Sequence, residues 1–140
     1  MDFICLKGRL LEKAVLSVWS QCQYMPTEEK LRAMSDMYEA DCSVVPYAIA
    51  DETNIAGIII LKRMSPACYE IMSIAVDTPY RGRGIGTDLI ALSARELSCH
   101  ELCAETDNDA VEFYRKRGFD IISLGEKYPG VVRYLCKLKL

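Results

Sequence analysis

Histidine is almost absent from this chain of 140 residues, which contains only His100. The seven cysteines include no C-x-x-C pair, so neither residue type offers the ligand spacing of a zinc site. Because the cysteine count is odd and most cysteines lie in apolar segments, we expect buried free thiols in a reducing cytosol. We expect His100 to lie in a solvated turn, away from any site.

Long apolar runs are missing as well, since the longest uncharged one, Ile55 to Leu61, is far too short to cross a bilayer. The N-terminus has no basic region followed by an apolar run, so we predict no signal peptide, no membrane partner and a cytoplasmic protein. The net charge of −3 argues against nucleic acid as a partner. A mildly acidic surface would suit a cationic amine.

The remaining composition is that of an ordinary globular protein, with 51% hydrophobic and 26% charged residues. The length fits one domain over residues 1–140. Hydrophobic periodicity predicts, in chain order, a strand at 2–7, helices at 10–22 and from Pro26, strands at 43–50, 55–63 and 67–76, a helix at 84–97, a strand at 101–105, a helix at 108–117, and strands at 119–124 and 131–138. This order, β-α-α-β-β-β-α-β-α-β-β, predicts an α/β protein with a mixed sheet and helices on both faces.

A glycine-rich loop, Arg81-Gly82-Arg83-Gly84-Ile85-Gly86-Thr87, separates a predicted strand from a predicted helix. Its glycines let the backbone approach a ligand closely, and the unpaired N–H groups of the next helix form an anion site. The two arginines and the Thr87 hydroxyl suit phosphate oxygens. The alternative is a tight strand-to-helix turn with two exposed arginines.

Two familiar phosphate loops do not match this segment. A P-loop has lysine after its last glycine, whereas Gly86 is followed by Thr87 and Asp88. A dinucleotide fingerprint would have a glycine at position 87 and would lie in a first βαβ unit. A nucleotide or simple phosphate is therefore a weaker alternative as the ligand.

The segment Val76–Gly86 closely resembles the acetyl-CoA motif of the GCN5-related N-acetyltransferase (GNAT) superfamily. That motif is Gln or Arg, two residues, Gly, one residue, then Gly or Ala, and Arg81, Gly84 and Gly86 satisfy it. A second block, Ala110–Phe119, resembles the later helix of the superfamily and its Gly-Phe exit. The resemblance implies one GNAT domain, with a central mixed sheet of six or seven strands flanked by four helices.

The resemblance also implies the chemistry, which is direct transfer of an acetyl group from acetyl-CoA, as cosubstrate, to an amine without a metal. In this superfamily the strand before the loop is splayed from its neighbour, and by position the Ile74 N–H would donate to the thioester oxygen. Asn108 lies one place later than the usual asparagine, which falls at Asp107. The residues that the resemblance assigns to cofactor binding are Ile74, Ala75, Val76, Arg81, Gly82, Arg83, Gly84, Ile85, Gly86, Thr87, Asn108 and Tyr114.

Two side chains are candidates for proton transfer. Tyr114 in the second block is the candidate acid, because a phenol with a pKa of about 10 can reprotonate a thiolate. Its alternative role is packing on a helix face. Glu70 is the candidate base, and its even spacing from Val76 predicts that both side chains lie on one strand face. Glu70 could instead anchor a substrate ammonium group or be a solvated carboxylate.

The sequence does not identify the acceptor of the acetyl group, and we expect an amine of a small molecule or of a peptide. It would contact the first two helices, the loop 24–26 and the last hairpin. Asp36, Glu39 and Asp41 add negative charge there, although charged helix faces are usually just solvated. No cysteine neighbours a candidate base in the sequence, so no acyl-cysteine route is predicted. A non-catalytic acyl-CoA-binding sensor or partner module would use the same loop, and a homodimer formed through the final strands is also open.

Overall fold

The protein, described over residues 1–140 by a computed structural model, contains one seven-stranded sheet with the strand order β1-β2-β3-β4-β5-β7-β6. All neighbouring strands are antiparallel except β4 and β5, which are parallel. The predicted mixed sheet is therefore confirmed. The strands are β1 (Asp2–Cys5), β2 (Val44–Ala50), β3 (Ile55–Ser65), β4 (Cys68–Val76), β5 (Glu101–Thr106), β6 (Asp120–Tyr128) and β7 (Val131–Lys139).

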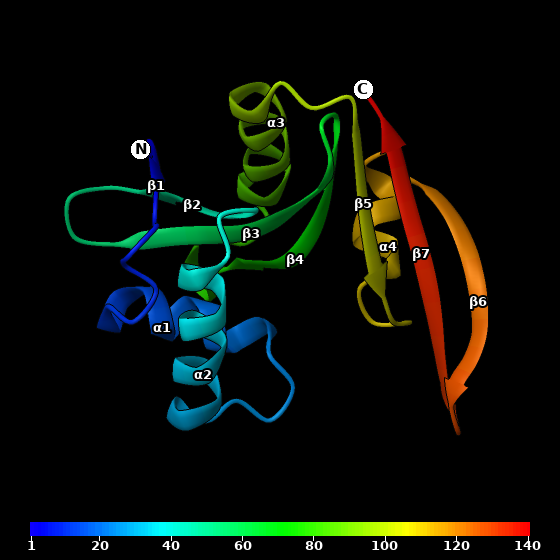
Figure 1. Cartoon of the computed structure of the whole chain (residues 1–140), viewed down its shortest axis with the longest axis horizontal. Helices are drawn as coiled ribbons and strands as arrows, with labels where there is room; N and C mark the ends of the chain where they lie inside the picture. Colours follow the sequence, from blue (N-terminus) through cyan, green and yellow to red (C-terminus); the bar gives the residue numbers. More distant parts are fainter.

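Helices cover both faces of the sheet, in the predicted order (Figure 1). One face carries α1 and α2, and the other carries α3 and α4, as the two sets of core residues show. Two short 3₁₀ turns, η1 and η2, follow α1 and β4. The helical elements are α1 (Lys13–Trp19), η1 (Ser20–Cys22), α2 (Glu28–Ala40), η2 (Thr78–Tyr80), α3 (Ile85–Leu97) and α4 (Val111–Lys116).

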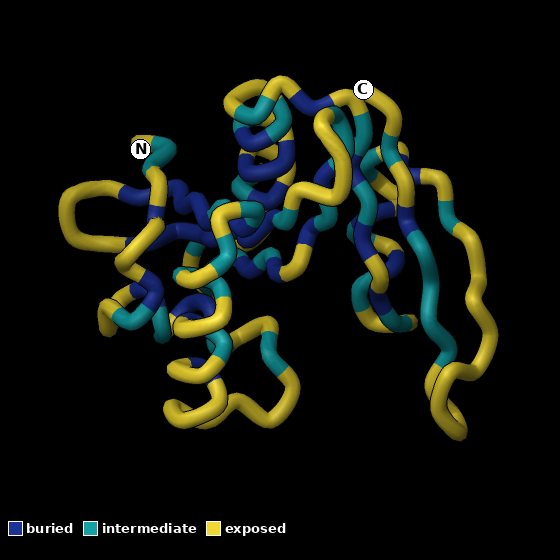
Figure 2. Tube along the Cα trace, in the orientation of Figure 1, coloured by how far each residue is buried: buried dark blue, intermediate teal, exposed yellow.

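The buried strand β3 lies between two hydrophobic cores. Ile59 and Leu61 pack toward α3 and α4, whereas Ile58 and Ile60 pack toward α1 and α2, and all four side chains are fully buried. Each such burial stabilises the fold by roughly 1.5–3 kcal/mol. Figure 2 shows the resulting buried centre and the exposed outer strand β6.

Three helix starts are set by local hydrogen bonds and turns. The Thr27 hydroxyl accepts a hydrogen bond from the Lys30 backbone N–H at 3.0 Å and so caps α2. Helix α4 starts only at Val111. The Asp107 carboxylate accepts hydrogen bonds from the N–H groups of Asp109 and Ala110 and so closes a turn before the helix. Helix α1 also begins later than predicted, because Leu10 is buried in the turn that precedes it.

A β-bulge in β4 overturns one prediction about Glu70. Ser73 pairs with Ile60 and Ile71 with Leu61, so Met72 is an extra residue on β4. Ile71 packs into the α3–α4 core before the bulge, whereas Val76 packs against that same core after it. Since Glu70 and Ile71 point to opposite faces, Glu70 and Val76 lie on opposite faces of the strand. The prediction of a shared face was wrong, because it assumed unbroken alternation.

All seven cysteines are free, and their burial is more varied than predicted. Cys99 and Cys136 are buried, as expected, and Cys68 and Cys103 are half-buried, whereas Cys5, Cys22 and Cys42 are exposed. His100 is exposed immediately before β5, as predicted. None of the helices combines the length and apolar character that crossing a bilayer would require.

Candidate active site

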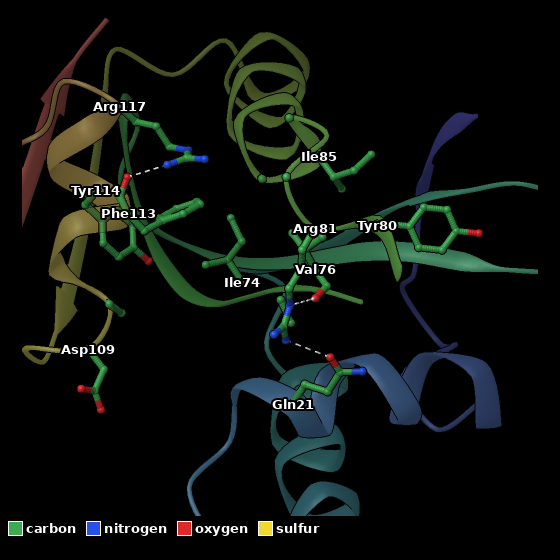
Figure 3. A pocket seen from close by; sticks show the side chains of 15 residues that line it. Gln21, Ile74, Val76, Tyr80, Arg81, Ile85, Asp109, Phe113, Tyr114 and Arg117 are labelled. Atoms are coloured by element: carbon green, nitrogen blue, oxygen red, sulfur yellow. Dashed lines mark hydrogen bonds between the residues drawn. The ribbon is translucent and has the colours of Figure 1, made fainter. Parts of the chain in front are cut away.

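A cavity of about 740 Å³ lies at the end of β4, between the loop that follows this strand and α4 (Figure 3). Its volume is within the range of small-molecule sites. It is lined by Gln21 of η1, by Ile74, Ala75 and Val76 of β4, by Tyr80, Arg81, Gly82, Gly84, Ile85 and Gly86 of the loop region, and by Asp109, Ala110, Phe113, Tyr114 and Arg117 in and around α4.

The structure brings most of the sequence-predicted site residues into this one cavity. The predicted parts of β4, most of the glycine loop and Tyr114 all line it. Four predicted residues do not line it, namely Glu70, Arg83, Thr87 and Asn108. The sequence reasoning missed Gln21, Tyr80, Asp109, Ala110, Phe113 and Arg117. Of these, Tyr80 lies in the first motif block, and Ala110, Phe113 and Arg117 lie in the second, so the motifs could have indicated them.

The cavity exists because β4 and β5 part. The two strands pair only through Cys68–Glu70 and Glu101–Cys103, whereas β4 continues to Val76 beside β3. Beyond Glu70, the backbone of β4 therefore has no strand partner on its β5 side. The N–H and C=O groups on this edge need hydrogen-bond partners from outside the sheet. An extended ligand that contains amides can provide them.

The glycine loop leads into the N-terminus of α3. Gly82 and Gly84 have φ angles of 77° and 81°, which favour glycine, and Gly84 is the N-cap of α3. No side chain caps this helix end, so its first N–H groups and its dipole are available to an anion. The predicted anion site is therefore compatible with the observed backbone.

The loop packs tightly against α4. A Cβ atom at Gly86 would lie 2.8 Å from Cε1 of Phe113, so a larger residue there would displace the ring or the loop. On the other side of Phe113, the Arg117 guanidinium stacks 3.7 Å from the ring centroid, and its Nη1 donates to the Phe113 carbonyl at 2.8 Å. Burial lowers the pKa of Arg117. Phe113 thus joins the loop to a cationic wall of the cavity.

The two loop arginines have different surroundings. The Arg81 Nε donates to the Val76 carbonyl at 3.0 Å, and its Nη2 donates to Gln21 Oε1 at 3.1 Å, so the side chain folds back along β4. Arg83 lies 5.7 Å from the centroid of the Tyr80 ring and does not line the cavity. Of the two, Arg81 is therefore the cation at the cavity wall.

Tyr114 presents a buried phenol to the cavity. The residue is only 5% exposed, and its ring meets those of Phe113 and Phe119 edge-on, with centroids 5.1 and 5.2 Å away. None of the protein's hydrogen bonds involves its hydroxyl, and burial raises the pKa of Tyr114 well above its usual range. The phenol is therefore protonated at neutral pH, and its proton is available to a ligand.

Glu70 lies on the face of β4 opposite to Tyr69 and Ile71, and it is half-buried between Lys62 of β3 and Cys103 of β5 in the strand register. The ammonium group of Lys62 lies 3.7 Å from Asp41, and no ion pair involves Glu70. Its carboxylate is therefore free to interact with a cation that approaches from the α1–α2 side.

The η1 turn contacts the bulge of β4 on that same side. The Gln23 Nε2 donates to Ser73 Oγ at 3.2 Å. Cys22 is exposed as a residue, but its sulfur faces the protein, donates to the Trp19 carbonyl at 3.3 Å and lies beside Ser73 and the Ile74 N–H. This burial of the sulfur raises the pKa of the Cys22 thiol. The turn lies at the end of the first predicted helix, 10–22, which we expected near the acceptor, but the sequence did not indicate its contact with Ser73.

Asn108 is turned away from the cavity. Its Oδ1 accepts a hydrogen bond from the Tyr134 hydroxyl at 2.7 Å, and the residue is exposed. Asp107 takes the capping role before α4, and Asp109 lines the cavity in place of Asn108. The predicted cofactor contact of Asn108 is thus not supported by its position.

The glycine loop and α4, which contain the two sequence motifs, line the same cavity and touch at Gly86 and Phe113. The model of the acetyltransferase (GNAT) family matches residues 12–119. The chain belongs to this family. The GNAT fold is also found in solved structures that cover 99% of the chain, namely a GNAT family acetyltransferase from Elizabethkingia anophelis with acetyl-CoA bound (TM-score 0.71, 20% identity, 97% of that chain) and the ribosomal-protein-S18-alanine N-acetyltransferase from Escherichia coli (TM-score 0.72, 17% identity, 92% of that chain).

Two curated GNAT relatives match about half of the chain. The N-alpha-acetyltransferase RimI from Mycobacterium tuberculosis is 41% identical over 76 residues, which are 52% of this chain and 48% of that protein. The mycothiol acetyltransferase from Corynebacterium glutamicum (strain R) is 35% identical over 77 residues, which are 51% of this chain and 26% of that protein. The aligned segment is thus less than half of either relative.

Proposed function

We propose that this chain, as one domain over residues 1–140, transfers an acetyl group from acetyl-CoA directly to an amine of a small molecule or a peptide. One observation carries the proposal: the free edge of β4 and the uncapped N-terminus of α3 border the same cavity. An extended amide edge beside an anion site suits a ligand with a pantetheine arm and a pyrophosphate.

The residues present fit acetyl-CoA. The backbone of Gly82, Gly84 and Gly86 and the Arg81 side chain would hold the pyrophosphate, and the open edge of Ile74–Val76 would hold the amides of the arm. When bound, acetyl-CoA supplies an acetyl thioester, which an amine can attack. The backbone of β4 beyond Glu70 has no strand partner on its β5 side, which supports a ligand that pairs through amides there.

Three groups of the chain would serve the reaction. The Ile74 N–H lies two residues beyond the extra residue Met72, on the part of β4 that β5 does not pair with, and would stabilise the carbonyl oxygen as negative charge develops. The Tyr114 hydroxyl, which has no protein partner and a raised pKa, holds the proton for the departing thiolate. Glu70 would remove a proton from the amine or anchor its ammonium form, since its carboxylate has no ion-pair partner. All three belong to the proposal.

The acceptor amine would enter from the α1–α2 side, where Glu70 lies and where η1 contacts the bulge. The relatives named above are an N-alpha-acetyltransferase and a mycothiol acetyltransferase, so their names span a protein terminus and a small molecule. A panel of amines therefore has to include both classes.

The test is to incubate the protein with acetyl-CoA and polyamines, aminoglycosides, amino acids or peptides, while free thiol is followed spectroscopically. We expect thiol release that depends on one class of amine, with the acetylated amine identified by mass. If calorimetry detects CoA binding but no amine releases thiol, the chain is instead a non-catalytic acyl-CoA-binding module. If ATP binds as tightly as CoA, the assignment of the cosubstrate is wrong.

A further inference from the structure

The side-chain amide of Gln21 bridges two groups at the start of the glycine loop. Its Nε2 donates to Asp77 Oδ1 at 2.8 Å. Its Oε1 accepts from Arg81 Nη2 at 3.1 Å, a bond that Figure 3 shows. The amide orientation follows from its partners, because a carboxylate can only accept and a guanidinium can only donate. Gln21 thus ties η1 to a segment 56 to 60 residues further along the chain.

This bridge fixes the direction of the Arg81 side chain. The Arg81 Nε is already held by the Val76 carbonyl at 3.0 Å, so a second fixed partner defines the plane of the guanidinium. Of the five N–H donors of an arginine, two are used in these bonds. The other three belong to a side chain that lines the cavity, where they are available to an anionic ligand.

The bridge also separates a cation from an anion. Asp77 accepts from Gln21 and from the Thr78 N–H at 3.0 Å, and it forms no ion pair with Arg81. If the amide of Gln21 were removed, the guanidinium of Arg81 would have a free carboxylate nearby to turn to. Contact with Asp77 would cancel the positive charge at the cavity wall.

We propose that Gln21 is a positioning residue for the phosphate-binding loop: it holds Arg81 toward the cavity and keeps it from Asp77, so that the loop binds a pyrophosphate. This inference rests on the proposed use of acetyl-CoA. Gln21 acts through Arg81 and takes no part in the transfer of the acetyl group. Gln23, the residue after η1, donates a hydrogen bond to Ser73 beside the bulge and not to the glycine loop.

The experiment compares two ligands that share the pantetheine arm. Dissociation constants of CoA and of pantetheine, which lacks the pyrophosphate, are measured by calorimetry for the wild-type protein and for Gln21→Ala. We expect Gln21→Ala to weaken CoA about fivefold, or about 1 kcal/mol, while the affinity for pantetheine is unchanged. The ratio of the two dissociation constants is the readout, because a general loss of structure would weaken CoA and pantetheine alike and leave this ratio unchanged.

Two further variants sharpen the comparison. Gln21→Glu keeps an acceptor for Arg81 but places a carboxylate on it, so we expect the preference for CoA to fall at least as far as in Gln21→Ala. If Gln21→Glu instead keeps the wild-type preference for CoA, the neutral amide is not needed to keep the charge of Arg81 available, and the proposal is overturned. Gln23→Ala is the matched control, because it removes the side-chain hydrogen bond to Ser73 and does not affect the glycine loop. We expect this variant to prefer CoA over pantetheine as strongly as the wild type does.

The possible failures are distinguishable. If the wild-type protein does not bind CoA, or does not prefer it to pantetheine, both the proposed cosubstrate and the role of Gln21 are wrong. If the wild type prefers CoA and Gln21→Ala retains the full preference, only the role of Gln21 is wrong. Equal weakening of both ligands, with a lowered melting temperature, would reduce Gln21 to a structural residue and likewise overturn the proposal.

Discussion

Glu70 and Val76 lie on opposite faces of β4, because the extra residue Met72 reverses the alternation between them. Val76 lines the cavity proposed for acetyl-CoA, whereas Glu70 does not. In the proposed reaction, acetyl-CoA would occupy the cavity, and the amine would approach Glu70 from the α1–α2 side. The bulge decides which side chains of β4 face each side of the sheet.

The first prediction concerns Glu70. We expect Glu70→Gln to lower kcat by about 10²-fold or more if Glu70 is the base, with the affinity for CoA unchanged, because the carboxylate lies outside the cofactor cavity. If Glu70 only anchors an ammonium group, KM for the amine should rise while kcat is kept. Steady-state kinetics and CoA calorimetry distinguish the two, and unchanged kinetics would remove Glu70 from the site. Glu52→Gln, in an exposed turn, is the control.

The second prediction concerns the phenol of Tyr114. Tyr114→Phe keeps the ring between Phe113 and Phe119, so we expect little loss of stability but a fall in kcat of about 10²-fold or more. Since burial raises the pKa of Tyr114, the phenol keeps its proton up to strongly alkaline pH, and no loss of activity between pH 7 and 9 should arise from it. Tyr134→Phe removes a hydroxyl that bonds Asn108 and should leave kcat unchanged. Equal losses of turnover and CoA affinity in Tyr114→Phe would argue against an acid role.

The third prediction tests the contact between the loop and α4. Gly86→Ala places a Cβ 2.8 Å from a Phe113 ring atom, so the loop or the ring has to move. We expect weaker CoA binding and a free energy of unfolding lower by about 1–3 kcal/mol. In the double variant with Phe113→Leu, part of both losses should be recovered, because the smaller side chain leaves room. Purely additive losses in chemical denaturation would show that the two residues do not interact.

The fourth prediction concerns stability in acid. Lys127, 2.6 Å away, and Arg133 hold the pKa of Glu105 below its usual value. A carboxylate with a lowered pKa in the folded state stabilises the protein above its unfolded pKa of about 4.3, and this contribution is lost as the pH falls through the folded pKa. We expect Glu105→Gln to lower the melting temperature slightly at pH 7 and not at pH 2–3, since an exposed pair contributes at most about 1 kcal/mol. An equal decrease at both pH values would exclude the ion pairs as the cause.

Much of the fold could be predicted because the signals are local. The stripe in α2, the acids at its start and the β-rich runs of β2 and β3 each lie within one short segment, and the order of elements is as predicted. The glycine loop was readable for the same reason: its backbone requirements at Gly82 and Gly84 and its position before a helix depend on neighbouring residues only.

The chemistry of the site depended on contacts that no local pattern contains. Gln21 reaches Arg81 across 60 residues, and Phe113 meets Gly86 because α4 packs beside the start of α3. Asn108 was expected at the cofactor, but its side chain pairs with Tyr134 on β7. Such pairings are set by the order of strands in the sheet and not by spacing along the chain.

The sequence by itself therefore determined the elements, the glycine loop before α3 and the tyrosine of α4, because propensity, capping and motif chemistry act over a few residues. Only the tertiary structure decided on which side of β4 each group lies, since a single extra residue, Met72, reverses the alternation. It also decided that β4 keeps a free edge, because β5 pairs with it over three residues and then departs. The cavity results from that departure.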